Sequence, residues 1–422
     1  SQFIRYSKFA KTSDMMVILR HNNLLVSSIL RSVKGDLNAL SPNVKEVLLS
    51  VGDTITELSF NKCGIRSEAL KDIVQAFPRL KHLSLKGCLE IKNDALTHLI
   101  TLKDQLKSLN LLGCKFISED ALNHIAKLTE LEQLYLQCDD HLNLALLAPL
   151  TRLRALRLEG FRVPDFPHFP LFISLTELSV SITLVNGMPE VDLTPLANLT
   201  SLTKLHLTGV AISDAILVHL SQLTFLTDLN FSQSYLQANQ GWGITDAGVL
   251  HFERFFPRLK KLKLSYQPIT DVGLAHLALC KGLTELKLPY CSGITKAGFA
   301  PFAATGTLLR KLDLSYCFGA VLYSNMNTDD ICNHLAQFVH LTHLNLQGIN
   351  MPSSAALERL KVQLPNLEIP SSEIKSFLEG VGQLKKMLRK ELLDDIDIAV
   401  AMLYITYRDQ YCPSFLRSWF SL

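Results

Sequence analysis

Apolar residues recur at the first, fourth and sixth positions of a six-residue phrase along most of the chain. Alternation of this kind predicts a short strand with one buried face. A weaker copy at 364–369 is predicted to close the series. Most intervals between phrases are 22–27 residues, and the phrases begin at Ile55, Leu80, Leu106, Leu131, Leu153, Leu175, Leu202, Leu226, Leu259, Leu283, Leu309 and Leu341.

A turn and a helical phrase follow most of the predicted strands, as at 67–77, 93–100 and 119–128. Ser67 and Asn93 stand at the start of two of these phrases and are expected to cap the helices. One strand and one helix cannot cover their own apolar faces, so successive units must stack. The pattern therefore predicts an α/β leucine-rich-repeat solenoid, with a parallel sheet on the concave face and helices on the convex face.

The middle of the repeat series departs from this pattern. The units that begin at Leu131, Leu153 and Leu175 are shorter or irregular, and 161–167 contains Pro164 and Pro167. Proline removes a backbone donor and blocks a regular helix. We expect extended or 3₁₀ structure on the outer face of these units.

Two further motifs carry a family resemblance. Several units continue as I-[ST]-x-x-[AG]-[LVF], at 117–122, 244–249, 269–274 and 294–299. The ninth position of five units is cysteine, namely Cys63, Cys88, Cys114, Cys291 and Cys317. Over about 44–369 the chain resembles the cysteine-containing leucine-rich-repeat subfamily found in F-box/leucine-rich-repeat proteins. The resemblance implies an intracellular protein-recognition solenoid. Residues 1–52 lack the Leu-Pro pair and the Trp of an F-box.

The repeats divide the chain into three parts. Residues 1–52 are predicted to form an N-terminal helical cap, in which Ser41 and Pro42 begin a helix that ends before Gly52. Residues 53–369 form a repeat domain of about 12 units plus a partial one. Residues 370–422 are predicted to be a C-terminal helical cap; the alternative is a helical extension that binds a partner or a membrane surface.

Composition narrows the classes of function. A net charge of +3 does not favour nucleic acid as a partner, and the apolar runs are shorter than the roughly 20 residues of an integral membrane segment. Nine cysteines without a C-x-x-C pair indicate reduced thiols in an intracellular protein. We expect no metal and no cofactor. The histidines that recur in the helical phrases are interpreted as helix-surface residues: His98, His124, His219, His251, His276 and His334.

Candidate binding residues follow from the strand positions that face the concave surface, namely the third, fifth and seventh. At the eighth position, Tyr266, Tyr290 and Tyr316 occur in consecutive units and should form an aromatic ladder, because stacked strands lie about 4.8 Å apart. Tyrosine with nearby cations is common at protein hot spots. The alternative is that these tyrosines pack under the rim for structure. The remaining candidates are Lys263, Lys287, Lys311, Trp242, Tyr135, Arg157 and His206.

Two insertions, near 236–243 and 318–327, follow their strands directly and should project from one rim; the alternative is that they are tolerated surface loops. Trp242 belongs to the first.

The sequence therefore predicts a non-enzymatic protein–protein interaction module that binds a protein partner on its concave face. Phosphate-loop, nucleophile-elbow and zinc-protease motifs are all missing from the sequence. We expect a cytoplasmic monomer. The alternatives are a substrate-recognition adaptor for a ubiquitin ligase and an effector, delivered by an intracellular bacterium to a host cell cytoplasm, with activity or membrane binding in its C-terminal helices.

Overall fold

The computed structural model describes most of the repeat region. The described residues are 19–20, 22–115, 117–137, 143–161, 166–182, 192–233, 242–298, 302–303, 308–317, 329–347 and 353–368. The chain divides into two units, Ser1–Leu367 and Glu368–Leu422. The expected C-terminal cap at 370–422, the core of the first insertion and the whole of the second lie outside the described residues.

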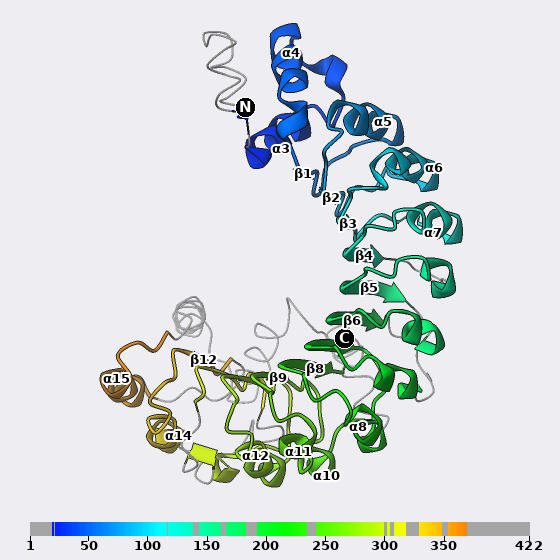
Figure 1. Ribbon diagram of the computed structural model, residues 1–422. Helices are drawn as coiled ribbons and strands as arrows, with labels where there is room; N and C mark the ends of the chain where they lie inside the picture. Colours follow the sequence, from blue (N-terminus) through cyan, green and yellow to red (C-terminus); the bar gives the residue numbers. More distant parts are fainter. Residues whose placement is uncertain are drawn as a thin grey trace, which may run out of the picture. The chain divides into compact units, whose positions relative to one another are not determined.

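Twelve parallel strands form one sheet within the first unit, and their order in the sheet is their order in the chain (Figure 1). Each strand pairs in register with the next, so that equivalent positions of successive repeats lie side by side. The strands are β1 Glu57–Ser59, β2 His82–Ser84, β3 Ser108–Leu111, β4 Gln133–Gln137, β5 Ala155–Phe161, β6 Glu177–Ile182, β7 Lys204–Thr208, β8 Asp228–Ser232, β9 Lys261–Lys263, β10 Glu285–Lys287, β11 Lys311–Asp313 and β12 His343–Asn345.

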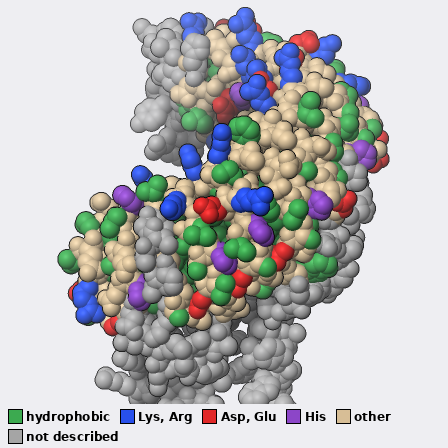
Figure 2. Space-filling view, turned by 60° about the horizontal axis from the view of Figure 1, so that its bottom comes forward, with side chains coloured by type: hydrophobic (Ala, Val, Ile, Leu, Met, Phe, Trp, Pro, Cys, Tyr) green, Lys and Arg blue, Asp and Glu red, His purple; other side chains and the backbone are tan. Residues whose placement is uncertain are grey.

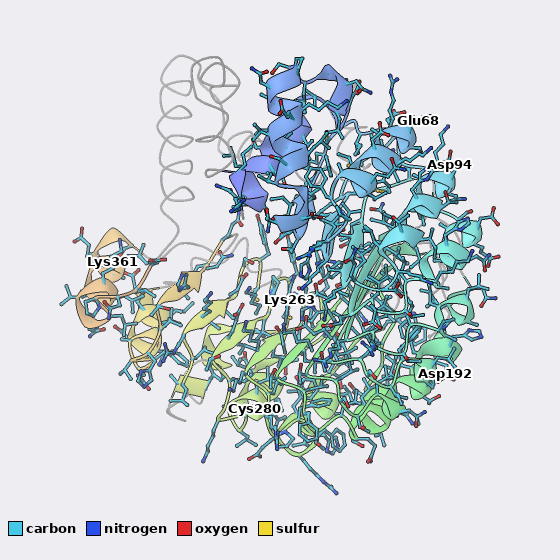
Figure 3. All side chains as sticks on the ribbon, turned by 45° about the horizontal axis from the view of Figure 1, so that its top comes forward. Glu68, Asp94, Asp192, Lys263, Cys280 and Lys361 are labelled. Atoms are coloured by element: carbon cyan, nitrogen blue, oxygen red, sulfur yellow. The ribbon has the colours of Figure 1, made fainter. Side chains whose placement is uncertain are left out.

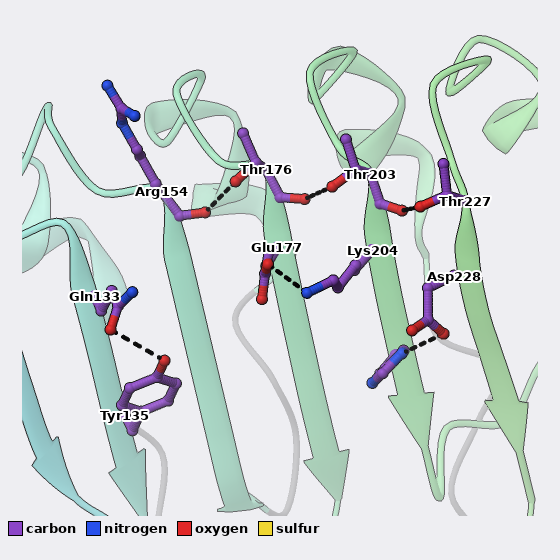
Figure 4. Close-up of polar contacts among 10 residues, drawn as sticks. Gln133, Tyr135, Arg154, Thr176, Glu177, Thr203, Lys204, Thr227 and Asp228 are labelled. Carbon is purple, nitrogen blue, oxygen red and sulfur yellow. Dashed lines mark hydrogen bonds and ion pairs between the residues drawn. The ribbon is translucent and has the colours of Figure 1, made fainter. Parts of the chain in front are cut away.

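The repeated leucines form the core behind the sheet. In the second unit Leu80, Leu83 and Leu85 are at most 1% exposed, and the same three positions are buried in the other units. The second position of several repeats, immediately before the strand, adds a ladder of hydroxyl groups. Thr176, Thr203 and Thr227 each donate from Oγ1 to the backbone oxygen of the equivalent residue one strand back, at 3.0–3.2 Å (Figure 4). The fold is thus the predicted α/β leucine-rich-repeat solenoid.

Helices and 3₁₀ turns cover the other side of the core, on the outside of the arc in Figure 1. In the repeats that follow β1–β3 and β7–β12 the regular helices are α5 Ser67–Ala76, α6 Asn93–Thr97, α7 Glu119–Ile125, α8 Asp214–Leu220, α10 Asp246–Val249, α11 Phe252–Phe255, α12 Asp271–Leu277, α14 Asp329–Leu335 and α15 Ser354–Gln363. Short 3₁₀ segments continue or replace a helix at η3 His98–Leu102 and η7 Lys296–Gly298.

The middle repeats have 3₁₀ turns in place of helices, which is one of the two structures expected for their outer face. These turns are η4 Leu144–Leu147, η5 Phe166–Leu171 and η6 Thr194–Asn198. Pro170 lies inside η5, and a proline opens η6. Proline lacks a backbone N–H donor. A 3₁₀ segment tolerates this loss because it is short and contains few backbone hydrogen bonds.

Hydrogen bonds between repeats fix the start of three helical segments in the C-terminal half, α10, α12 and η7. Asp214 accepts from Thr245 N at 2.9 Å and from Thr245 Oγ1 at 2.6 Å. Asp246 binds Thr270 in the same way, and Asp271 binds Thr295. Thr245 and Thr270 also cap their own helices. The expectation that Ser67 and Asn93 are caps was wrong, because both are the first helical residue and instead bond to the neighbouring repeat.

The N-terminal segment covers the open edge of the sheet. It contains α3 Asn23–Ser32, η1 Leu37–Ala39, α4 Pro42–Ser50 and η2 Gly52–Thr54. The side chain of Ser27 accepts a hydrogen bond from Ser59 N at 3.0 Å, and that of Asn23 accepts one from Thr56 N at 3.3 Å. An uncovered edge strand would leave these donors open to another chain. Helix α3 therefore lies against β1 at this end of the sheet.

Details of the N-terminal segment refine the prediction. Helix α4 begins at Pro42 as expected, but Ser41 makes no capping side-chain bond. A β-carbon on Gly52 would lie 2.2 Å from Ala76 O, so close packing rather than helix termination requires this glycine. At the other end of the unit, Leu364 and Leu367 of the predicted partial repeat are buried. Across the described residues, no helix is both long and apolar enough to span a membrane.

Candidate functional site

The concave surface is made of two parallel rows of side chains. The third positions of consecutive strands lie side by side, and so do the fifth positions. The fifth-position row runs from β4 to β11 through Tyr135, Arg157, Ser179, His206, Asn230, Lys263, Lys287 and Asp313. Five of the ten candidate residues therefore belong to one continuous row. Figure 2 shows positive, negative and histidine side chains interspersed on one face of the molecule.

Charges in the middle of this surface neutralise one another. Lys204 Nζ lies 2.5 Å from Glu177 Oε1, across the β6–β7 pair (Figure 4). Arg157 binds Glu159 two residues along its own strand, with Nη2 2.5 Å and Nε 2.7 Å from Oε1. Exposed pairs of this kind contribute little stability, about 0–1 kcal/mol each. Their main effect is to satisfy Arg157, which leaves less of its charge for a ligand.

His206 and Asp228 form a second kind of pair. His206 Nε2 lies 2.9 Å from Asp228 Oδ1, and these side chains are 34% and 21% exposed. Burial alone would raise the pKa of Asp228, but the hydrogen bond with His206 and the charges of His206, Lys261 and Lys204 lower that pKa overall. Asp228 is therefore held as a carboxylate, and it orients His206 within the fifth-position row.

Tyr135 lies at the start of that row. Its hydroxyl is 3.5 Å from Gln133 Oε1, at the limit of a hydrogen bond (Figure 4). Burial of the ring, together with the charge of Glu177, raises the pKa of Tyr135. The phenol stays protonated and can donate a hydrogen bond to a ligand.

Tyr266, Tyr290 and Tyr316 stack as the repeat spacing predicts. The ring centroids of Tyr266 and Tyr290 are 4.2 Å apart with 7° between the planes, and those of Tyr290 and Tyr316 are 4.6 Å apart with 3°. All three side chains are half-buried. We call this set the tyrosine ladder. It lies at the end of strands β9, β10 and β11, adjoining the concave rows.

The backbone of the tyrosine ladder is in the left-handed region. The φ angles are 57° for Tyr266, 62° for Tyr290 and 57° for Tyr316. In other repeats the equivalent position is Lys62, with a φ of 56°, or a glycine with φ between 72° and 82°, namely Gly87, Gly113, Gly160 and Gly209. A bulky residue in this region is rare and costs about 1–2 kcal/mol. Two stacked pairs return about 0.5–1.5 kcal/mol each, so the tyrosines gain little over glycine for stability alone.

The lysines beside the ladder fall into two rows. Lys263 and Lys287 are cross-strand partners in the fifth-position row, where the third member is Asp313. Lys311 is a third-position residue and lies in the other row, between Glu285 and His343. Lys287 Nζ is bound to Glu285 Oε1 at 2.6 Å.

Lys263 differs from Lys287, the other lysine of its row. It is half-buried on the strand layer (Figure 3), and no carboxylate of the described residues lies within 4.0 Å of its ammonium. Burial lowers the pKa of Lys263, and the charge of Lys287 lowers it further, against the opposite effect of Asp313. An ammonium that loses water without gaining an acceptor is unfavourable.

Trp242 lies apart from these rows, immediately before the α10 repeat. With the side-chain amide nitrogen of Gln233 facing Trp242, that nitrogen donates to the backbone oxygen of Trp242 at 3.1 Å. The amide oxygen of Gln233 then accepts from Gly243 N at 3.2 Å. Gly243 bridges to Ser213 of the preceding repeat. The indole is half-exposed. The rest of the first insertion, at 234–241, lies outside the described residues.

The recurrent cysteines are structural. Four of them, Cys88, Cys114, Cys291 and Cys317, are buried and donate from Sγ to a backbone oxygen one repeat back, at 2.8–3.2 Å. Burial raises the pKa of Cys88 to about 11 and, with a smaller effect of Cys88, raises that of Cys114 to about 12. Such thiols are inert packing groups. Among the described residues, no group of three His, Cys, Asp or Glu side chains could hold a metal ion.

Two further residues of β9 and the turn after it bear on this surface. Lys261, a third-position residue of β9, lies opposite both Asp228 and Glu285. Ser265, expected to line the concave face, is 6% exposed and bonds to Ser232 Oγ at 3.1 Å. The seventh position therefore points into the core at this repeat. The small hydroxyl side chain of Ser265 was the feature of the sequence that could have indicated this.

Comparison with known proteins supports the fold. No family model matches the chain. An internalin (InlF) of Listeria monocytogenes matches with a TM-score of 0.50 and 23% identity, over 82% of this chain and 87% of the other. Rad7, from the yeast Rad7–Elc1 complex, matches with a TM-score of 0.54 and 17% identity, over 87% and 94%. At these identities the likeness concerns the leucine-rich-repeat fold and not a particular activity.

Proposed function

We propose that this protein is a non-enzymatic interaction module that binds a protein partner on the concave face of its sheet. The observation that carries the proposal is the tyrosine ladder, in which three stacked rings occupy a strained backbone position beside the lysines of β9–β11. Strained residues are retained where they serve a site, and tyrosine with flexible cations is typical of protein interfaces. Rad7 was solved in complex with another protein, Elc1, which agrees with a binding role for this fold.

The compartment belongs to the same proposal. The seven described cysteines are free thiols, and most of them are buried. Reduced cysteines at repeated structural positions suit the cytoplasm better than an oxidising compartment. This agrees with the resemblance to the cysteine-containing repeats of F-box/leucine-rich-repeat proteins.

Affinity capture from a eukaryotic lysate, quantified by mass spectrometry, tests the proposal. The test variant replaces Tyr266, Tyr290 and Tyr316 with glycine, which fits the left-handed backbone and leaves the fold intact. The control variant replaces three exposed residues of the outer layer, Val218, Val272 and Val339, with serine. We expect the bound protein to be lost from the tyrosine variant and retained by the valine variant. The reverse result would place the interaction on the convex face and contradict the proposal.

An adaptor role for a ubiquitin ligase is tested separately. Deletion of 1–40 should then abolish co-purification with a ligase subunit while substrate capture by the concave face persists. Deletion of 1–40 also removes α3, which covers β1 and could affect folding. A shorter deletion that ends at Met16 keeps α3 and serves as the control.

A further inference from the structure

Unpaired cations on the concave surface gather on the strands that carry the tyrosine ladder. Six Lys or Arg residues occupy third or fifth positions of the described strands. Three of them, Arg157, Lys204 and Lys287, are bound to a carboxylate. The others have no carboxylate within 4.0 Å among the described residues, and they lie on β9 and β11: Lys261, Lys263 and Lys311.

The acidic residues of the same strands are already engaged. Asp228 binds His206, and Glu285 binds Lys287. Asp313 accepts from Ser315 N at 3.0 Å and from Ser315 Oγ at 2.7 Å. Among the described residues, strands β8–β11 thus supply no uncommitted carboxylate to the three lysines, although Asp313 is next but one to Lys263 in the row.

The partial burial of Lys263 distinguishes it from Lys261 and Lys311, which are exposed. An exposed ammonium is satisfied by water, whereas a half-buried one has lost part of its hydration and gains most from an ionised acceptor. Lys287 lies on the neighbouring strand in the same row and adds positive potential, even though Glu285 holds it.

We infer that strands β9–β11 bind an acidic segment of the protein partner, with a carboxylate of that segment on the Lys263 ammonium and the tyrosine ladder against the same segment. This inference rests on the proposed function and specifies the chemistry of the partner. The ladder offers an apolar surface about three strands wide, and its phenols can hydrogen-bond to a carboxylate or a backbone. The cations supply the charge complementarity that selects an acidic sequence.

Fluorescence anisotropy with defined peptides tests the inference on the full chain. The probe is a fluorescein-labelled 12-residue peptide in which Glu alternates with Ser, and the matched probe has Gln in place of Glu. We expect the Glu probe to bind at least fivefold more tightly than the Gln probe. Lys263→Gln should weaken binding of the Glu probe at least fivefold, and Lys263→Arg should restore it.

Lys204→Gln is the matched control, because it removes a lysine of the same surface that is already paired with Glu177. Its effect on the Glu probe should be less than twofold. Equal losses in Lys204→Gln and Lys263→Gln would mean unspecific attraction and overturn the inference. Polyuridylate and the unlabelled Glu peptide should also be compared as competitors at equal concentrations of negative charge. If polyuridylate displaces the probe at the lower concentration, the ligand is a nucleic-acid phosphate and the inference is overturned.

The two proposals fail in different ways. If the Glu probe does not bind but lysate capture still depends on the tyrosine ladder, the acidic segment is wrong and the concave interface stands. If neither the probe nor the lysate protein depends on these residues, the concave interface itself is wrong.

Discussion

The carboxylate of Asp271 occupies the space that a β-carbon on Gly298 would need. A β-carbon built there would lie 2.5 Å from Asp271 Oδ1, and the three nearest atoms all belong to Asp271. The same relationship joins Asp246 to Gly273, where the separation is 2.2 Å. The aspartate must be in this place because it accepts two hydrogen bonds from the threonine that precedes the next helix. The glycine of the I-T-x-x-G phrase is therefore set by the carboxylate of the repeat before it.

Gly298→Ala should lower the free energy of unfolding by about 1–3 kcal/mol, since the new methyl group overlaps the carboxylate. Asp271→Ala alone should cost about 1–2 kcal/mol through the two lost hydrogen bonds. The double variant should be more stable than the sum of the two losses predicts, because the overlap is relieved. Urea denaturation of the four proteins measures this coupling. Gly64→Ala is the control, since its nearest neighbour is the Lys34 side chain at 3.5 Å and its loss should stay within about 0.5 kcal/mol. Strict additivity would contradict the steric explanation.

Tyr290 gives a test of backbone strain. Glycine adopts a φ of 62° without penalty, whereas alanine does not. Tyr290→Ala should therefore be less stable than Tyr290→Gly by about 1 kcal/mol, although alanine is the larger side chain. Urea midpoints of the two variants decide the point. An alanine variant as stable as the glycine variant would show that this position carries no strain.

The pKa of Asp228 predicts a pH dependence with a definite sign. Its folded pKa is lower than its ordinary value of 3.8, so below neutral pH the unfolded chain takes up the proton first. The stabilisation from this group is complete near pH 7 and is lost as the pH falls through the folded pKa, below about pH 4. Asp228→Asn should lower stability by about 1 kcal/mol at pH 7 and by nothing near pH 2. Denaturation curves between pH 2 and pH 7 measure the difference. A constant difference across this range would contradict the assignment.

Cysteine modification rates should separate two members of the same repeated position. Cys63 is half-buried, whereas Cys114 is buried with its pKa raised to about 12. Because the thiolate is the reactive form, N-ethylmaleimide should modify Cys63 at least about a hundredfold faster than Cys114 in the folded protein. Peptide mass spectrometry gives both rates, and unfolding in urea should make them equal. Equal rates in the folded state would mean that Cys114 is accessible.

The sequence was sufficient for the fold because one phrase specifies each repeat. Leucines at three fixed positions determine the buried face of a strand, and their spacing determines the register between strands. The stacking of Tyr266 on Tyr290 followed from the same spacing. The prolines near Phe166 were sufficient to exclude a regular helix there, but they left extended and 3₁₀ structure open.

The sequence could not determine how the charges pair. Glu285 has three possible partners, Lys261, Lys287 and Lys311, and small differences in side-chain geometry select Lys287. Among the described residues, that selection leaves Lys261 and Lys311 without a carboxylate partner. Glycines at the equivalent position of other repeats indicate a left-handed backbone at Tyr290. Tyrosine rarely adopts that conformation, so the sequence did not predict it.

The joint between Asp214 and Thr245 is chemically the same as the joints between Asp246 and Thr270 and between Asp271 and Thr295. Each junction is therefore interchangeable with the next, since the same acceptor meets the same donors. A gene rearrangement that duplicated or removed one whole repeat would bring together matching halves and create no new mismatch. The C-terminal half of this chain can thus lengthen or shorten in evolution by single repeats. Such a change alters the length of the binding surface and keeps the Asp–Thr hydrogen bonds between repeats.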